Sequence, residues 1–336
     1  MVLSATKIRT SKVGRTLAAV LAAATLLGSF AACGSKANAS DKLQKADGSS
    51  TTQITVGVCP GPYGDMVKEV IAPLLKDKGY ELTTQEFTDY VQPNKALASG
   101  SIDANLFQHG NYLKKFTSDN NLDLTSLGQT PTLGLGIYSN KYKSVDEIPD
   151  GATVSVSNDA SNLARSLDVL RQVGLVELSG DTDATKATVD DITSNPKNLQ
   201  IKTVDAAQLA RSLDSVDFSL VPGNYAWDAN LDPNSALALE DQTEGVMEVF
   251  VVRTSDVDTD FAKKVKDLLV SQEFKDAIAN SRFSSFGKPS AWGDDASGDS
   301  SSSSSSATES TSSSSSASAT DSESASEDKE SSSSSD

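Results

Sequence analysis

Residues 54–75 read ITVGVCPGPYGDMVKEVIAPLL and place a short β-branched run directly before a helical pattern. The run at 54–58 predicts a buried strand, and Pro60-Gly61-Pro62 ends it with a turn. The apolar side chains that follow recur at helical spacing, at Met66, Val67, Val70, Ile71, Leu74 and Leu75. Pro73 removes one backbone donor, so we expect it to kink or tighten this helix. A strand followed by a helix favours an α/β fold.

The same alternation continues along the chain. A helix is predicted over 93–99, closed by Gly100, and a second over 163–173, closed by Gly174. Further strands are predicted at 81–87, 102–107, 152–156, 200–204 and 217–221. Strands that alternate with helices indicate parallel sheets with βαβ crossovers.

The pattern stops near residue 140 and then begins again, which predicts two lobes. The apolar runs at 133–138 and 247–252 are the natural strands for crossing from one lobe to the other. We therefore assign residues 53–137 and 245–293 to a first lobe and residues 138–244 to a second.

The N-terminus carries the pattern of a secreted lipoprotein. Four basic residues without an acid precede an apolar run over 17–30 that is too short to span a bilayer comfortably. The small residues Ala31 and Ala32 then precede Cys33, as a lipoprotein signal peptidase requires. We predict a signal peptide over 1–32 and a lipid on Cys33 that holds the protein on the extracytoplasmic face of the cell membrane. The alternative is an ordinary cleaved signal with an incidental cysteine.

Low-complexity segments flank the globular part. Residues 33–52 are small and polar and predict a flexible tether. Residues 294–336 are mostly serine with scattered acids, a composition that predicts a disordered tail, most simply a solvated spacer. The chain has two cysteines, so acylation of Cys33 leaves Cys59 without an intramolecular disulfide partner.

The composition excludes several classes of function. The formal net charge is −17, and no basic patch with interleaved aromatics appears, which argues against nucleic acid as a partner. His109 is the only histidine, so a triad has one possible centre and a metal cluster has few ligands. No phosphate-binding glycine loop or paired-cysteine motif is present. We expect no catalytic residue, no metal and no cofactor, and we predict that the protein is not an enzyme.

Aromatic residues follow two of the predicted strands. Tyr90 comes after the strand at 81–87. Phe107 ends the strand at 102–107, His109 follows it, and Tyr112 opens the next helix. Parallel sheets bind ligands beyond the carboxyl ends of their strands, so these side chains should share one rim. An aromatic wall suits a small ligand with an apolar side chain. The alternative is that Phe107 merely ends a buried strand and His109 caps a helix.

The second lobe offers a charged complement. Asn158 to Asn162 supplies capping side chains, and Arg165 lies in the first turn of the following helix, away from its apolar face. An arginine there meets the positive end of the helix dipole, and an anion would offset that cost. We predict that Arg165 binds a ligand carboxylate. The alternative is a solvated arginine paired with Asp168 or Asp159.

Several long motifs in the same order resemble the methionine-binding lipoproteins of bacterial ABC importers (the NlpA type). They are VGVCPGP at 56–62, FTDYVQPN at 87–94, SIDANLFQH at 101–109, NDASNLARSL at 158–167 and NPKNL at 195–199. The resemblance extends over residues 54–292. It implies a two-lobed periplasmic-binding-protein fold of type II with hinge strands, which closes over its ligand and delivers it to an importer permease.

The resemblance also implies roles for individual residues. Tyr90, Phe107, His109 and Tyr112 would surround the ligand side chain, Arg165 and Asn162 would hold its carboxylate, and Asn224 would also contact the ligand.

Three positions depart from the family pattern. Pro222 and Glu248 stand where the family usually has asparagine, and Tyr63 replaces a common histidine. Glu248 would repel a ligand carboxylate unless it meets the ligand's ammonium group, so we include it among the ligand-binding residues. Methionine is the leading candidate ligand, with another amino acid, a D-amino acid or a short peptide as alternatives. A surface interaction or adhesion lipoprotein is the competing class of function.

Overall fold

The computed structural model describes Leu43 and residues 51–180, 183 and 185–293. The predicted signal peptide, the predicted lipidation site Cys33 and the Ser-rich tail lie outside the described residues. Within the described ranges, none of the helices combines the length and the apolar character that a membrane crossing needs.

The first sheet holds five strands among the described residues, in the order β2-β1-β3-β12-β4. They are β1 (Thr52–Val58), β2 (Tyr80–Glu86), β3 (Ala104–His109), β4 (Leu124–Gln129) and β12 (Glu248–Arg253). β1 pairs in parallel with β2 and β3, as the alternation of strands and helices predicts. β12, from the run predicted as a crossing strand, runs antiparallel to β3 and β4. The chain reaches β12 directly from the second sheet, without the crossover helix that parallel pairing needs.

The second sheet has the order β11-β5-β10-β6-β9 in the described part of the chain. Its strands are β5 (Gly136–Tyr138), β6 (Thr153–Ser157), β9 (Gln200–Val204), β10 (Phe218–Val221) and β11 (Ala238–Leu239), and β7 (Glu177–Leu178) pairs separately with β8 (Ile192–Ser194). β6 is parallel to β9 and β10, whereas β5 is antiparallel to β10 and β11. We use lobe I and lobe II for the parts built on the first and second sheets. β5 spans the predicted lobe boundary at 137/138 and pairs only with strands of the second sheet. The other lobe boundaries stay predictions.

Pro73 is accommodated by a local change of helix type. α1 (Pro62–Met66) leads into a π-helical segment (Val67–Ile71), and α2 (Ala72–Lys76) follows without a break. In the π-helical segment the N–H of Ala72 donates to the carbonyl of Val67, five residues back. The expected tightening is therefore wrong, because the helix widens next to the proline that lacks a donor, whereas the expected kink stays a prediction.

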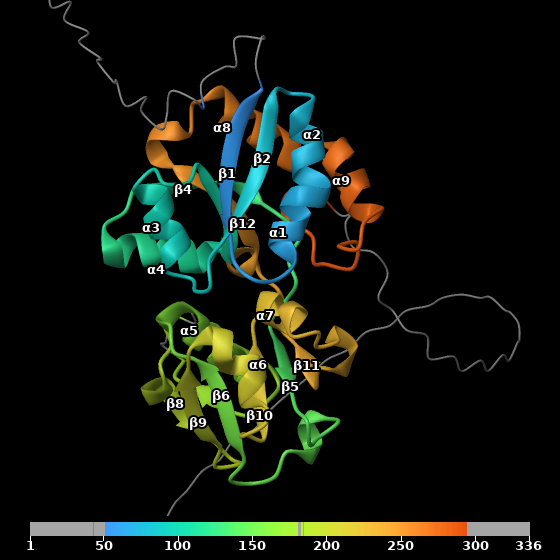
Figure 1. The fold of residues 1–336 in the computed structure, drawn as a ribbon. Helices are drawn as coiled ribbons and strands as arrows, with labels where there is room; N and C mark the ends of the chain where they lie inside the picture. Colours follow the sequence, from blue (N-terminus) through green and yellow to red (C-terminus); the bar gives the residue numbers. More distant parts are fainter. Residues whose placement is uncertain (1–42, 44–50, 181–182, 184, 294–336) are drawn as a thin grey trace, which may run out of the picture. The chain divides into compact units, whose positions relative to one another are not determined.

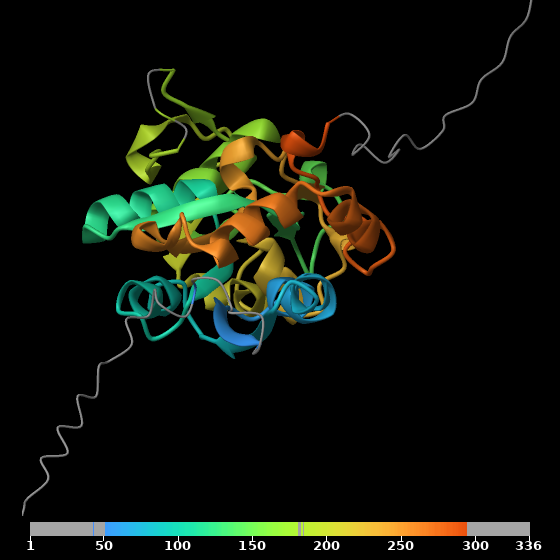
Figure 2. The ribbon, with the colours of Figure 1, turned by 90° about the horizontal axis from the view of Figure 1, so that it is seen from above.

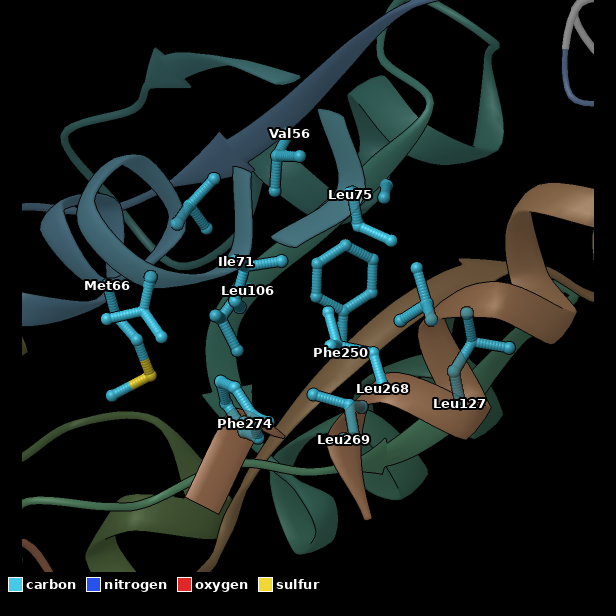
Figure 3. Close-up of a cluster of buried hydrophobic side chains, with 14 of the residues drawn as sticks. Val56, Met66, Ile71, Leu75, Leu106, Leu127, Phe250, Leu268, Leu269 and Phe274 are labelled. Atoms are coloured by element: carbon cyan, nitrogen blue, oxygen red, sulfur yellow. The ribbon is translucent and has the colours of Figure 1, made fainter. Parts of the chain in front are cut away.

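Helices cover both faces of the first sheet (Figures 1 and 2). α1 and α2 share one large apolar core with α8 (Asp260–Leu269) and α9 (Gln272–Ala279), whereas α3 (Gln92–Ala98) and α4 (Gly110–Asn120) pack on the opposite face. Figure 3 shows the ring of Phe250, from β12, between Leu75 of α2 and Leu268 of α8. Leu43 is fully buried in the same core. Leu43, which belongs to the predicted tether, therefore packs into the core of lobe I, because burial of a leucine side chain is favourable.

Lobe II buries the face of its longest helix against the second sheet. α5 (Ala160–Gln172) contributes Ala164, Leu167 and Leu170 to a core with β6. Its N-cap is Asp159, whose side chain accepts a hydrogen bond from the N–H of Asn162. α6 (Leu209–Ser212) and α7 (Gly223–Asp228) form a second apolar cluster. The packing of Ala164, Leu167 and Leu170 of α5 against the second sheet sets the direction in which Arg165 points.

The two segments that connect the lobes lie side by side. The N–H of Glu240 donates to the carbonyl of Leu135 at 3.0 Å, and the N–H of Thr130 donates to the carbonyl of Glu248 at 2.8 Å. Between them, the N–H of Glu248 donates to Oγ1 of Thr132 at 2.8 Å. Residues 130–135 and 240–248 therefore form one hydrogen-bonded connection, while the predicted crossing runs 133–138 and 247–252 contain β5 and β12, each of which pairs within one sheet.

Candidate ligand-binding site

A small pocket lies between the lobes. Its lining consists of Tyr90, Phe107, Gln108, His109, Tyr112, Leu133, Asn162, Arg165, Pro222, Gly223, Asn224 and Glu248. All eight residues predicted to bind the ligand are in this set. A concave site lined by aromatic rings with a few polar and charged groups is typical of small-molecule binding.

Three aromatic rings form one wall of the cavity. The centroid of the Tyr90 ring lies 6.0 Å from that of Phe107 and 5.7 Å from that of Tyr112, and the Tyr112 hydroxyl donates to the carbonyl of Tyr90 at 3.1 Å. Tyr225, from α7 in lobe II, packs against Tyr90 in a tilted arrangement, with the ring centroids 5.2 Å apart. The sequence analysis missed Tyr225, although it follows directly after Asn224. Mutual packing holds the rings as a preformed apolar surface.

His109 both caps α4 and lines the cavity. Its Nδ1 accepts a hydrogen bond from the N–H of Tyr112 at 3.2 Å, so the ring is neutral and carries its proton on Nε2. Nε2 then donates to Oδ1 of Asn162 at 3.0 Å. Burial, with the nearby charge of Arg165, lowers the pKa of His109 to about 3. The helix-capping alternative is therefore correct, and it coexists with a place in the cavity wall.

Asn162 connects His109 to lobe II. Its Nδ2 donates to both carboxylate oxygens of Asp159, at 3.2 and 3.1 Å, and these contacts turn Oδ1 toward His109. The orientation of the amide is thus set by Asp159, the N-cap of α5.

A second bridge between the lobes runs through Asn224. Its Oδ1 accepts from the Tyr90 hydroxyl at 2.6 Å, and its Nδ2 donates to the carbonyl of Pro60 at 2.9 Å. This approach requires a glycine on each side. A Cβ at Gly223 would lie 2.1 Å from the carbonyl oxygen of Leu133, and a Cβ at Gly61, whose φ is +125°, would lie 2.7 Å from Asn224.

Arg165 is buried and forms an ion pair with Glu240. Its Nε donates to Oε2 of Glu240 at 2.7 Å, and its Nη2 donates to Oε1. Burial alone would lower the pKa of the guanidinium, but the carboxylate of Glu240 raises it. The alternative of a solvated arginine paired with Asp168 or Asp159 is wrong, since Arg165 is 8% exposed and Asp168 pairs with Arg171.

The sequence analysis missed Glu240. It lies 75 residues from Arg165, in an irregular segment, and neither periodicity nor spacing marks it. Glu240 occupies the Nε–Nη2 edge of the guanidinium, and an arginine presents a second edge at Nη1 and Nη2. Arg165 can therefore keep this ion pair and still bind a second carboxylate.

Glu248 places a second carboxyl group in the cavity. It is 7% exposed, begins β12 and pairs in register with His109 on β3. Its Oε2 is buried and has no hydrogen-bond partner among the described residues. Burial raises the pKa of Glu248 to about 8, although Arg165 opposes the shift. Tyr63, the other noted departure from the family, lies outside this lining, and its hydroxyl accepts from the N–H of Leu133 at 3.2 Å.

Two α/β lobes joined by crossing segments around a buried cavity define the type II periplasmic-binding-protein fold. Residues 54–290 match the family described as NlpA lipoprotein. The chain belongs to this family, which confirms the resemblance identified from its motifs.

Relatives and solved structures agree with this assignment. A relative from Vibrio cholerae, named as a probable D-methionine-binding lipoprotein MetQ, is 40% identical over 261 residues, which are 77% of this chain and 91% of the relative. A nutrient-binding protein from Burkholderia cenocepacia, solved bound to methionine, is 40% identical with a TM-score of 0.64, over 68% of this chain and 95% of that chain. A periplasmic substrate-binding protein of an ABC transporter from Coxiella burnetii is 36% identical with a TM-score of 0.62, over 67% and 95%.

Proposed function

We propose that the protein is a solute-binding lipoprotein that binds an amino acid between its lobes and delivers it to an ABC importer. The observation that carries this proposal is the aromatic wall of Tyr90, Phe107 and Tyr112 in the same buried cavity as Arg165 and Glu248. An apolar or thioether side chain packs well against aromatic rings. The guanidinium and the carboxyl group match the two charges of an amino acid.

Methionine is the leading candidate ligand. The names of the Vibrio cholerae relative and of the Burkholderia cenocepacia structure both refer to methionine and support this choice. In this proposal the free edge of Arg165, with Asn162 and Asn224 nearby, binds the ligand carboxylate. The aromatic wall and His109 enclose the ligand side chain.

The proposed function requires no catalytic group. His109, the one histidine of the chain, is neutral and uses both ring nitrogens in hydrogen bonds to Tyr112 and Asn162. It is therefore engaged as a structural contact, not held ready as a general base.

We place the protein on the outer face of the cell membrane, anchored through a lipid on Cys33, with an importer permease as its partner. The lipoprotein names of its relatives and the ABC-transporter description of the Coxiella burnetii protein support this placement. Mass spectrometry of the protein from the membrane fraction should find a diacylglyceryl group on the N-terminal peptide that begins at Cys33, and a Cys33→Ser variant should lack it. A wild-type protein without lipid on Cys33 would contradict the lipid anchor.

Thermal shift with a ligand panel tests the binding function. The secreted Cys33→Ser chain is heated with L- and D-amino acids and with dipeptides. A ligand present at a hundred times its dissociation constant adds about 2.7 kcal/mol to the free energy of unfolding. Stabilisation by methionine supports the leading candidate, and stabilisation by another compound corrects the ligand. If no compound stabilises the protein, an interaction or adhesion role replaces the proposal.

A further inference from the structure

We infer that Glu248 makes this cavity selective for ligands that carry a free, positively charged α-amino group. This inference rests on the proposed amino-acid-binding function and deepens it, because it names the part of the ligand that Glu248 requires.

The backbone around Glu248 holds its side chain in the cavity. Its N–H donates to Oγ1 of Thr132, its carbonyl accepts from the N–H of Thr130, and its strand position is opposite His109. The side chain lines the cavity together with Arg165. The backbone of Glu248 is therefore fixed in the connection between the lobes, and its carboxyl group is buried in the cavity lining.

Three hydrogen-bond donors of the cavity lining are committed to other acceptors, and the free edge of Arg165 is assigned to the ligand carboxylate. The hydroxyl of Tyr90 donates to Asn224, that of Tyr112 donates to the carbonyl of Tyr90, and Nε2 of His109 donates to Asn162. Within the described residues, Oε2 of Glu248 is buried without a partner. A buried acceptor without a donor is unfavourable, so a donor brought by the ligand gains from meeting it.

The charge balance of the cavity selects the kind of donor. Arg165 is already neutralised by Glu240 in a bidentate ion pair. An ionised Glu248 is thus left with no cation of its own in the lining. An ammonium group supplies three N–H donors and the missing positive charge, whereas a hydroxyl or an acylated nitrogen supplies no charge.

The other titratable groups around Glu248 do not compete with it near neutral pH. Burial raises the pKa values of the Cys59 thiol and of the Tyr63 and Tyr90 hydroxyls, and the pKa of His109 is about 3. Arg165 and Glu240 are held in their ion pair. Because the pKa of Glu248 is about 8, its ionised fraction grows between pH 6 and pH 9. Affinity for an ammonium ligand should rise over the same interval.

Calorimetric titration of the Cys33→Ser chain with two compounds, methionine and its α-hydroxy analogue, tests this inference. Methionine carries the ammonium group, and its α-hydroxy analogue has a hydroxyl in that place. In Glu248→Gln, which keeps the shape and removes the charge, we expect methionine to bind about tenfold more weakly or worse. The α-hydroxy analogue should bind equally well to both proteins. The exposed Glu177→Gln serves as the matched control and should leave both affinities unchanged.

The outcomes separate this inference from the proposed function. A selective loss of methionine affinity supports the role of Glu248. An equal loss for both compounds, or no loss, overturns it while leaving amino-acid binding intact. If neither wild type nor variants bind any amino acid, the proposed function fails first. Should Glu248→Gln not fold, the wild-type pH profile decides: methionine affinity that stays flat from pH 6 to pH 8.5 overturns the inference.

Discussion

Glu240 holds the guanidinium of Arg165 from one side, with Nε of the arginine 2.7 Å from Oε2 of the glutamate. The same carboxylate accepts a hydrogen bond from the N–H of Leu135 at 2.9 Å, through Oε1. Leu135 and Glu240 belong to the two segments that cross between the lobes. The residue proposed to bind the ligand carboxylate is therefore connected directly to the crossing segments.

Removing the charge of Glu240 should destabilise the fold strongly. Glu240→Gln leaves the buried Arg165 without its counter-charge, and breaking a buried ion pair in this way costs about 3–5 kcal/mol. Chemical denaturation monitored by circular dichroism measures the difference. Asp168→Asn, which breaks the exposed pair with Arg171, should cost less than about 1 kcal/mol and serves as control. Equal effects of the two variants would contradict this role for Glu240.

Arg165→Lys should weaken ligand binding without loss of folding. A lysine keeps the positive charge but lacks the second donor edge, so it cannot bind Glu240 and a ligand carboxylate in two bidentate contacts. We expect affinity for the ligand identified by thermal shift to fall about tenfold or more, as measured by calorimetry. Arg171→Lys, on the exposed side of the same helix, is the matched control. Wild-type affinity in Arg165→Lys would mean that the guanidinium does not hold the ligand.

The free energy of unfolding should fall at acidic pH because His109 has a lowered pKa in the folded protein. Its pKa is about 3 in the folded protein, against an ordinary value of 6.5, so the unfolded chain binds more protons between these values. The stabilising contribution of the neutral ring is complete above pH 6.5 and is lost as the pH falls toward 3. Urea denaturation at pH 7 and pH 5 should show a loss about 2 kcal/mol larger for wild type than for His109→Gln. Equal losses would show that His109 titrates normally.

Trp227 should report on contact between the lobes. This residue of α7 packs its ring 5.6 Å from that of Phe286, and the guanidinium of Arg282 lies 5.6 Å from the ring centroid. Both partners belong to the C-terminal segment that packs on lobe I. In a Trp292→Phe background, ligand binding should change the fluorescence of Trp227, because closure alters this contact. No change at saturating ligand would mean that the contact is the same with and without ligand.

Much of the fold follows from local patterns in the sequence. The β-branched run before Pro60-Gly61-Pro62 forms β1, and the period of apolar residues after Asp159 forms α5. The aromatic residues of the cavity could be named in advance, because the ends of parallel strands meet at one edge of a sheet. Pro73 shows the limit of this reasoning, since the missing donor is local but the widened helix that accommodates it depends on packing.

The sequence by itself determined the family, the alternation of strands and helices, and eight of the residues that line the cavity. Those properties follow from short motifs and from periodicity, which neighbouring residues set. Only the tertiary structure decided that β12 runs antiparallel, that Glu240 pairs with Arg165, and that Tyr225 and Trp227 of α7 contact lobe I. The physical reason is distance along the chain: these contacts join residues that become neighbours only when the chain crosses between the lobes and returns.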